Sequence, residues 1–178
     1  MTVFFAYLGW FLVSLAVADF IAGVFHWWED RYLTAETPFL LGVLIGGPNK
    51  EHHKDPLGLT RGTYCNRNWT TIVPSMVPMI ACLCIPAWRD GWLTFALLSQ
   101  ANEVHAWAHS KGKCNRFIEL LQEIGLVQNA KHHGGHHKAP FEVRYCVMTN
   151  WLNPVLDAVG FWRGCENLIA LTGIKVVA

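Results

Sequence analysis

Charged residues are scarce in this chain of 178 residues. Asp, Glu, Lys and Arg make up 15% of the sequence, whereas hydrophobic residues make up 52%. Soluble domains carry about 25% charged residues, so the composition favours an integral membrane protein, as do nine tryptophans and ten phenylalanines. The net charge is only +1, which gives no indication of nucleic-acid binding. The length suits one domain, which we place at residues 1–178.

Several familiar signals are absent. The six cysteines are scattered and none forms a Cys-x2-Cys pair, so we interpret them as reduced packing residues and expect neither a zinc ribbon nor a disulfide framework. No basic segment precedes the first apolar run, which argues against a cleavable signal peptide. We find no haem, flavin or nucleotide motif and no internal repeat.

Three apolar runs predict membrane-spanning helices. The first, residues 3–25, has 23 residues and one charge, Asp19; at a rise of about 1.5 Å per residue it crosses a hydrocarbon core of about 30 Å. The second, residues 70–88, contains three prolines that predict a kinked helix. The third, residues 92–107, follows so short a turn (89–91) that the two runs should form a hairpin.

The remaining segments complete an all-α prediction. Residues 117–127 have apolar side chains at i, i+3, i+4 and i+7, which predicts an amphipathic helix too short to span. The tail, residues 145–178, should lie at the membrane surface or pack on the functional site, with a re-entrant segment as the alternative. We therefore expect an integral membrane protein of three to four transmembrane helices with a histidine-rich cytoplasmic cap.

Histidine carries the chemistry of this sequence. The nine histidines are His26, His52, His53, His105, His109, His132, His133, His136 and His137. His105 and His109 are four residues apart, so on a helix they share a face and can chelate one ion. The adjacent residues His136 and His137 point about 100° apart on a helix and can therefore serve two different ions, and the same holds for His52 and His53.

The predicted topology places every histidine on one side of the bilayer. The first run ends at His26, the next pair lies between the first and second runs, and the others follow the hairpin. Thirteen of the fourteen Lys and Arg residues lie on the same side, and only Arg89 lies on the other. The excess of positive charge in cytoplasmic loops then predicts that the histidines face the cytoplasm.

Eight well-spaced imidazoles are too many for one octahedral ion and suit two. A structural zinc site would have four ligands, usually including cysteine, and a hydrolytic zinc site would have three. Nitrogen-rich ligation of two ions beside a membrane instead indicates redox iron and oxygen chemistry.

At this point the sequence resembles the plasmanylethanolamine desaturases, membrane enzymes that form the vinyl ether bond of plasmalogens. It is more distantly similar to a plant chloroplast desaturase that introduces a trans double bond into phosphatidylglycerol. The matching pieces cover roughly residues 16–174 and are Asp19-Phe20-x2-Gly23-x2-His26-Trp27, Glu51-His52-His53-x-Asp55-Pro56, Thr60-Arg61, Asn102-x2-His105-x-Trp107-x-His109, Leu121-Gln122, His132-His133-x2-His136-His137, Tyr145-Cys146, Trp151-Leu152-Asn153, Gly160-Phe161-Trp162-Arg163 and Leu171-Thr172-Gly173. Gly-Phe-Trp-Arg and Leu-Thr-Gly favour the ether-lipid branch. Family members often carry a further apolar segment before the first one here.

The resemblance implies two iron ions held by the eight histidines other than His132. His132 is a further candidate, as a ligand, as a neighbour of the ligands or as a proton carrier. Asp19 lies inside an apolar run, and an intramembrane carboxylate is a functional candidate. It would hydrogen-bond a ligand imidazole or help to hold metal, or simply be capped by polar neighbours. Glu103 and Asn102 are similar candidates, although an asparagine at the position of Asn102 more often merely pairs with another helix. The acids at 29 and 30 are interpreted as interfacial charge.

The resemblance also implies the reaction and its partners. The enzyme would use O2 and two electrons per turnover to remove hydrogen from C1 and C2 of the alkyl chain of an ether phospholipid. A cytochrome b5-like or ferredoxin-like donor would suit the basic cytoplasmic face. The membrane would be the endoplasmic reticulum in a eukaryote and the inner membrane in a bacterium.

Two alternatives remain open. An acyl-lipid desaturase or hydroxylase would use the same metal site. A histidine-rich metal transporter or metal-binding protein belongs to a different class, and it should bury its ionisable residues near the bilayer midplane. Here they crowd one end of the predicted spans, which disfavours a transporter.

Overall fold

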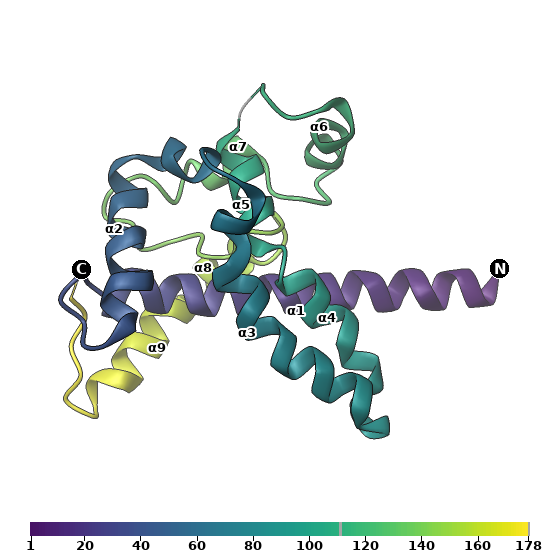
Figure 1. Cartoon of the computed structure of the whole chain (residues 1–178), viewed down its shortest axis with the longest axis horizontal. Helices are drawn as coiled ribbons and strands as arrows, with labels where there is room; N and C mark the ends of the chain where they lie inside the picture. The colour runs from purple at the N-terminus through teal and green to yellow at the C-terminus, as the bar shows by residue number, and fades with distance from the viewer. Residues whose placement is uncertain (111, 178) are drawn as a thin grey trace.

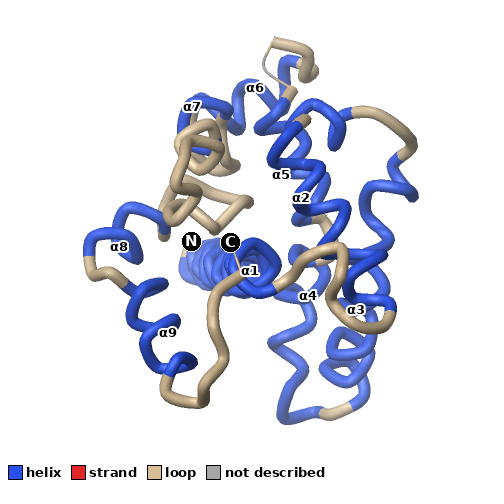
Figure 2. Tube along the Cα trace, turned by 90° about the vertical axis from the view of Figure 1, so that its left-hand side faces the viewer, coloured by secondary structure: helices blue, strands red, loops and turns tan. Residues whose placement is uncertain are grey.

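The computed structural model describes every residue except Lys111 and Ala178. The described residues form helices and loops, with no strand among them (Figure 2), which confirms the all-α prediction for this part of the chain.

Helix α1 (Thr2–Tyr32) is a long rod about which the other elements are arranged (Figure 1). It extends seven residues beyond the predicted run 3–25, because nothing between His26 and Tyr32 breaks a helix, and it ends where Leu33 is extended at φ −112°. At 31 residues it is the one described helix long and apolar enough to cross a membrane. The predicted number of three to four spans therefore remains a prediction.

A hairpin packs against one side of α1. Helix α3 (Tyr64–Cys84) is capped by Thr63, whose hydroxyl accepts from the N–H of Asn66, and it ends before Pro86. The turn η3 (Pro86–Gly91) leads into α4 (Trp92–Leu98). Trp10 Nε1 donates to the Asp90 carbonyl at 2.9 Å, which ties the tip of the hairpin to α1.

The predicted third run is divided into two helices. It breaks at Ser99 and Gln100, after which α5 (Ala101–His109) begins. Helix α2 (Gly47–Lys54) and the single turn α7 (Ala130–His133) lie on the same side of α1 as α5 (Figure 2). These elements carry most of the histidines.

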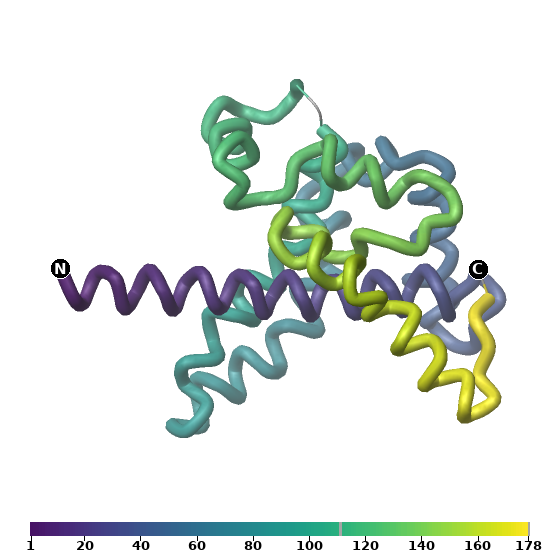
Figure 3. Tube along the Cα trace, turned by 180° about the vertical axis from the view of Figure 1, so that it is seen from behind, coloured from purple at the N-terminus to yellow at the C-terminus, as the bar shows by residue number. Residues whose placement is uncertain are grey.

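The other short elements complete the fold. They are the π-helical turn η1 (Gly42–Gly46), the 3₁₀ turn η2 (Pro56–Thr60), α6 (Arg116–Glu123), α8 (Asn153–Ala158) and α9 (Phe161–Ala170). Helix α6 is the predicted amphipathic helix, shortened at its C-terminal end. Helices α8 and α9 lie on the opposite side of α1 from the α3–α4 hairpin (Figure 2). Figure 3, the view from behind, shows α9 in yellow-green.

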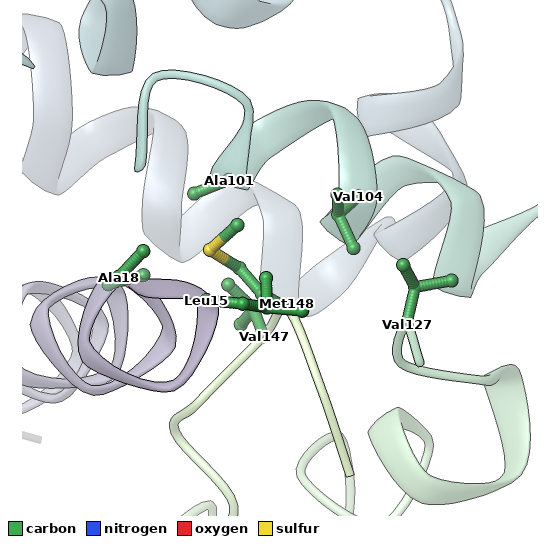
Figure 4. Close-up of a cluster of buried hydrophobic side chains, with 8 residues drawn as sticks. Leu15, Ala18, Ala101, Val104, Val127, Val147 and Met148 are labelled. Carbon is green, nitrogen blue, oxygen red and sulfur yellow. The ribbon is translucent and has the colours of Figure 1, made fainter. Parts of the chain in front are cut away.

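The tail packs into the centre of the protein. Residues 145–149 have no helical structure, yet all five are buried. Val147 and Met148 join α1 and α5 in the main apolar core (Figure 4). Gly23 of α1 allows this approach: a Cβ there would lie 2.6 Å from Cys146 Sγ and 3.1 Å from its backbone. This segment also reaches the histidines.

Candidate metal centre

Eight histidines and one carboxylate form two neighbouring groups. The five-histidine group consists of His52, His105, His109, His133 and His137, and the Asp30 group consists of His26, Asp30, His53 and His136. Each residue offers one atom that can bind a metal, a ring nitrogen or a carboxylate oxygen. Within each group, all of these atoms lie within 4.8 Å of one another. Each adjacent pair contributes one residue to each group, the arrangement expected from the 100° rotation between neighbours on a helix.

The five-histidine group has nitrogens too close together for imidazoles alone. The three Nε2 atoms of His105, His109 and His133 are 2.8, 2.9 and 3.1 Å apart. A hydrogen bond needs one donor and one acceptor, and three atoms in mutual contact cannot all be paired in that way. A cation that accepts all three lone pairs removes the conflict.

The spacing also indicates how such a cation would be coordinated. Imidazole nitrogens lie about 2.1 Å from a transition metal, so ligands at right angles are about 3.0 Å apart and tetrahedral ligands about 3.4 Å apart. The distance from His133 Nε2 to His137 Nε2 is also 3.1 Å. These distances among four of the five histidines therefore suit imidazole nitrogens that share one cation.

Burial keeps these imidazoles neutral. It lowers the pKa of His52 to about 2, with His109 as the next cause, and that of His137 to about 2, with His136 as the next cause. The pKa of His133 is also lowered by burial and then by His109. Neutral rings have free lone pairs at pH 7, as metal ligation requires.

Asp30 is the centre of the second group. Its Oδ1 lies 2.8 Å from His53 Nε2, and its Oδ2 lies 3.2 Å from His136 Nε2 and 3.7 Å from His26 Nε2. The side-chain exposure of Asp30 is only 4%. We interpreted this residue from the sequence as interfacial charge, and that interpretation is wrong. The spacing His26-x3-Asp30 on one helix face was the available signal.

Two backbone carbonyls orient the imidazoles of the Asp30 group. His26 Nδ1 lies 3.0 Å from the Tyr145 carbonyl, and His136 Nδ1 lies 2.8 Å from the Val143 carbonyl. A carbonyl only accepts, so each Nδ1 must carry the proton and each Nε2 presents a lone pair to the group. Metal-binding histidines are commonly oriented in this way.

Buried atoms without partners support the same interpretation. His26 Nε2, His136 Nε2 and both ring nitrogens of His52 are among the buried polar atoms that lack a hydrogen bond. Such atoms cost free energy unless something else satisfies them. The donor set is mainly imidazole nitrogen, which suits iron, copper, nickel or zinc. The residues therefore fit a pair of transition-metal ions.

Four residues from the sequence analysis lie outside both groups. His132 Nε2 accepts from Asn153 Nδ2 at 3.1 Å. Asp19 accepts from the N–H of Met148 at 2.8 Å and from the hydroxyl of Thr149 at 2.6 Å. These bonds attach residues 145–149 to α1.

The other two of the four stabilise the packing of α5. Glu103 pairs with Arg67 at 2.8 Å and accepts from Asn68 and Trp107. Asn102 Nδ2 donates to the Arg67 carbonyl at 2.9 Å. Through these bonds, α5 is fixed against α3.

A mainly apolar cavity of about 460 Å³ reaches the two groups. Its walls come from α1, α3, α5 and the segment around η1, and include Phe25, Leu44 and Pro74. His26 of the Asp30 group and His52 and His105 of the other group line it as well. An apolar ligand in this cavity would therefore lie beside both groups.

The two groups of ligands and the apolar cavity together define a class of protein, a candidate two-metal protein with a site for an apolar molecule. Comparison with known proteins gives the family. A lipid desaturase domain matches residues 15–177, and the chain belongs to the lipid desaturase family.

Its relatives include desaturases of two types. It is 30% identical over 173 residues to mouse (Mus musculus) plasmanylethanolamine desaturase 1, covering 89% of this chain and 64% of the relative. It is 31% identical to the plasmanylethanolamine desaturase of Myxococcus xanthus, covering 89% and 58%. Identity to the chloroplastic fatty acid desaturase 4-like 1 of Arabidopsis thaliana is 35%, covering 84% and 52%. The chain thus spans less than two thirds of each, and no solved structure matches it.

Proposed function

We propose that this protein is a membrane lipid desaturase that uses O2 and two iron ions to convert the alkyl ether chain of a phospholipid into a vinyl ether. The observation that carries the proposal is the apolar cavity that reaches both groups of ligands. A hydrocarbon chain lying in it would bring a single stretch of its carbon atoms next to the metal positions.

Selectivity would come from positioning. The lining of Phe25, Leu44 and Pro74 excludes water from the hydrocarbon, while the three histidines mark where reaction takes place. A bound ion pair supplies the oxidising power from O2, and the protein determines which C–H bonds it meets.

Electrons would reach the site from outside the chain. Each double bond formed with reduction of O2 to two waters requires two electrons and two protons besides the two hydrogens of the substrate. The exposed Lys54 and Lys138 directly follow His53 and His137 in sequence. These charges suit an acidic donor of the cytochrome b5 or ferredoxin type.

As part of the same proposal, the protein lies in a membrane with its histidines on the cytoplasmic side. Helix α1 is apolar enough to span, and its first turns expose Val3, Phe4 and Phe5. We retain the multi-pass topology of three to four spans as part of this proposal. The membrane would be the endoplasmic reticulum in a eukaryote or the inner membrane in a bacterium.

Acyl-lipid desaturation is the second candidate, because one relative is named a fatty acid desaturase 4-like protein. Its substrate would be an acyl chain in the same cavity. The two functions give different products: an acid-labile vinyl ether in one case and an acyl double bond in the other.

The test is expression in a host that contains alkyl ether phospholipids but no vinyl ethers, followed by lipid mass spectrometry and metal analysis of the purified protein. We expect vinyl ethers and two iron ions per chain. His105→Ala or His136→Ala should abolish the product while the protein still inserts.

His132→Ala is the matched control, since it removes an imidazole that belongs to neither group. It should retain both ions and the product. A new acyl double bond instead of a vinyl ether would favour the second candidate, and unchanged lipids with a fully loaded protein would contradict both.

A further inference from the structure

A row of oxidisable rings leads away from the Asp30 group. The ring centroid of Tyr145 lies 5.3 Å from that of His136 and 6.0 Å from that of His26. The Trp162 ring lies 5.0 Å from Tyr145, and Trp27 lies 5.9 Å from Trp162. Tyr32 follows at 5.5 Å from Trp27. We call Tyr145, Trp162, Trp27 and Tyr32 the aromatic chain.

The aromatic chain runs from the interior to the surface. Tyr145 is fully buried, Trp162 and Trp27 are 3% and 6% exposed, and Tyr32 is partly exposed. Within the described residues, Tyr145 is the one Tyr or Trp whose ring pairs with a ring of either histidine group. The five-histidine group has no such neighbour among them. In the Asp30 group, His53 also pairs with the ring of Phe141, but that ring is hard to oxidise. Packing alone would not require every member of such a row to be Tyr or Trp.

Indole and phenol rings lose an electron only to a strong oxidant. Reduction of the centre by a cytochrome-like or ferredoxin-like donor would therefore leave the aromatic chain unchanged. It becomes relevant when O2 has oxidised the centre and no lipid occupies the cavity. The buried side chains of Cys146 and Met148, one and three residues after Tyr145, are then open to irreversible or damaging oxidation.

We propose that the aromatic chain carries such an unused oxidising equivalent from the metal centre to the protein surface, and so protects the site. The proposal rests on the proposed function, because it needs a centre that O2 oxidises. At the surface end of the aromatic chain, Tyr32 would accept an electron from a small soluble one-electron reductant such as ascorbate.

The electron and proton movements balance. Trp162 gives one electron to the centre, across the contact with Tyr145, and takes one from Trp27. The Trp27 indole N–H donates to Glu166 Oε1 at 3.3 Å, so its proton passes to that carboxylate. Ascorbate then returns one electron through Tyr32, and the proton moves back to Trp27. The net change is one electron gained by the centre, with ascorbate losing one electron and releasing a proton to water.

The geometry around Trp27 suits this role. Arg31 Nε donates to Glu166 Oε1 at 2.6 Å, which holds the carboxylate in place beside the indole. Arg31 also lies 3.4 Å from Glu142. A purely apolar packing site would not place a carboxylate at the indole N–H.

The experiment exposes the reduced, iron-loaded protein to air without lipid and maps oxidised side chains by peptide mass spectrometry. Trp162→Phe and Trp162→Tyr are compared, because both rings fill similar space and only tyrosine is easily oxidised. Trp88→Phe is the control: Trp88 is exposed and lies in the hairpin turn η3.

In the unsubstituted protein and in Trp162→Tyr, we expect oxidation products on Trp27 and Tyr32, several-fold above those on Trp88. In Trp162→Phe, oxidation should shift to Met148, Cys146 and His136, and iron should be lost several-fold faster. Added ascorbate should slow iron loss in the unsubstituted protein and not in Trp162→Phe.

Equal iron loss in the Phe and Tyr variants, or oxidation spread evenly over exposed tryptophans, would overturn the proposal. Lipid analysis of the same preparations distinguishes failure of the aromatic-chain proposal from failure of the proposed function. If the lipid product forms normally and the variants do not differ, only the aromatic chain is refuted. If the unsubstituted protein neither consumes O2 nor makes the product, the proposed function fails and this inference fails with it.

Discussion

The side-chain amide of Asn49 donates to Oδ1 of Asp30 over 2.7 Å, and thereby joins α2 to the end of α1. Both residues are buried, with Asn49 9% exposed. The bond holds the carboxylate so that Oδ2 faces His26 and His136. Asp30 is thus positioned before any ion arrives, as preorganised sites require.

Replacing Asp30 tests its role directly. Asp30→Asn keeps the shape but removes the charge, and we expect the Asp30 group to lose its ion while the five-histidine group keeps one. Even outer partners of metal ligands are worth about 10–100-fold in affinity, so a ligand should cost at least that much. Metal analysis after dialysis gives the stoichiometry. Asp55→Asn is the control, since Asp55 is 51% exposed and pairs with Arg61; two ions retained in Asp30→Asn would refute the assignment.

Asp19 should act through folding. Asp19→Asn places an amide N–H2 where the N–H of Met148 or the hydroxyl of Thr149 now donates, so one buried donor loses its acceptor. We expect a destabilisation of about 1–3 kcal/mol, measured as a lower Tm in detergent. Metal content of the folded protein should not change. Loss of metal at an unchanged Tm would instead assign Asp19 to the metal centre.

Gly23 should tolerate no side chain. In Gly23→Ala the new Cβ meets Cys146 Sγ and backbone, which forces residues 145–149 away from α1 and the Tyr145 carbonyl away from His26. We expect a loss of about 1–3 kcal/mol, the usual cost of overpacking, together with weaker metal binding. Gly9→Ala on the same helix has nothing within 4 Å and should be neutral or stabilising. Similar Tm values for the two variants would contradict the described packing.

Filling the cavity should block the lipid without touching the metal. Ser75 lines the cavity and is 3% exposed, so Ser75→Phe is expected to occupy space that the hydrocarbon needs. Lipid mass spectrometry should show product reduced by an order of magnitude or shifted to shorter chains. Val77→Phe on the same helix is the control, because Val77 is 73% exposed. An unchanged product profile in Ser75→Phe, with normal metal content, would remove the cavity from the mechanism.

Much of the site follows from local spacing in the sequence. The four-residue spacing of His105 and His109, and the adjacency of His136 and His137, depend only on helix geometry, and the structure has both arrangements. Asp30 was missed because a charged residue after an apolar run is usually interfacial. Its spacing from His26 gave the better indication.

Other features depend on tertiary structure and have no local signal. Four histidines lie within six residues after Lys131, and their spacing does not show which one turns away; the family resemblance set His132 apart, and the structure pairs it with Asn153. The predicted third span breaks at Ser99, whose backbone carbonyl accepts from Thr71 of α3, a contact that no periodicity shows. The burial of residues 145–149 without a helix likewise depends on Asp19, more than a hundred positions earlier.

The mutual crowding of the Nε2 atoms of His105, His109 and His133 has a cellular consequence. His105 and His109 lie on α5 and His133 lies on α7, so a cation that accepts all three lone pairs would tie the two helices together. Binding energy at such a site is also folding energy. If the ions are iron, as the proposed function has it, a newly made chain in an iron-starved cell would be less stable and more open to proteases, so that iron supply would set the amount of this protein as well as its activity.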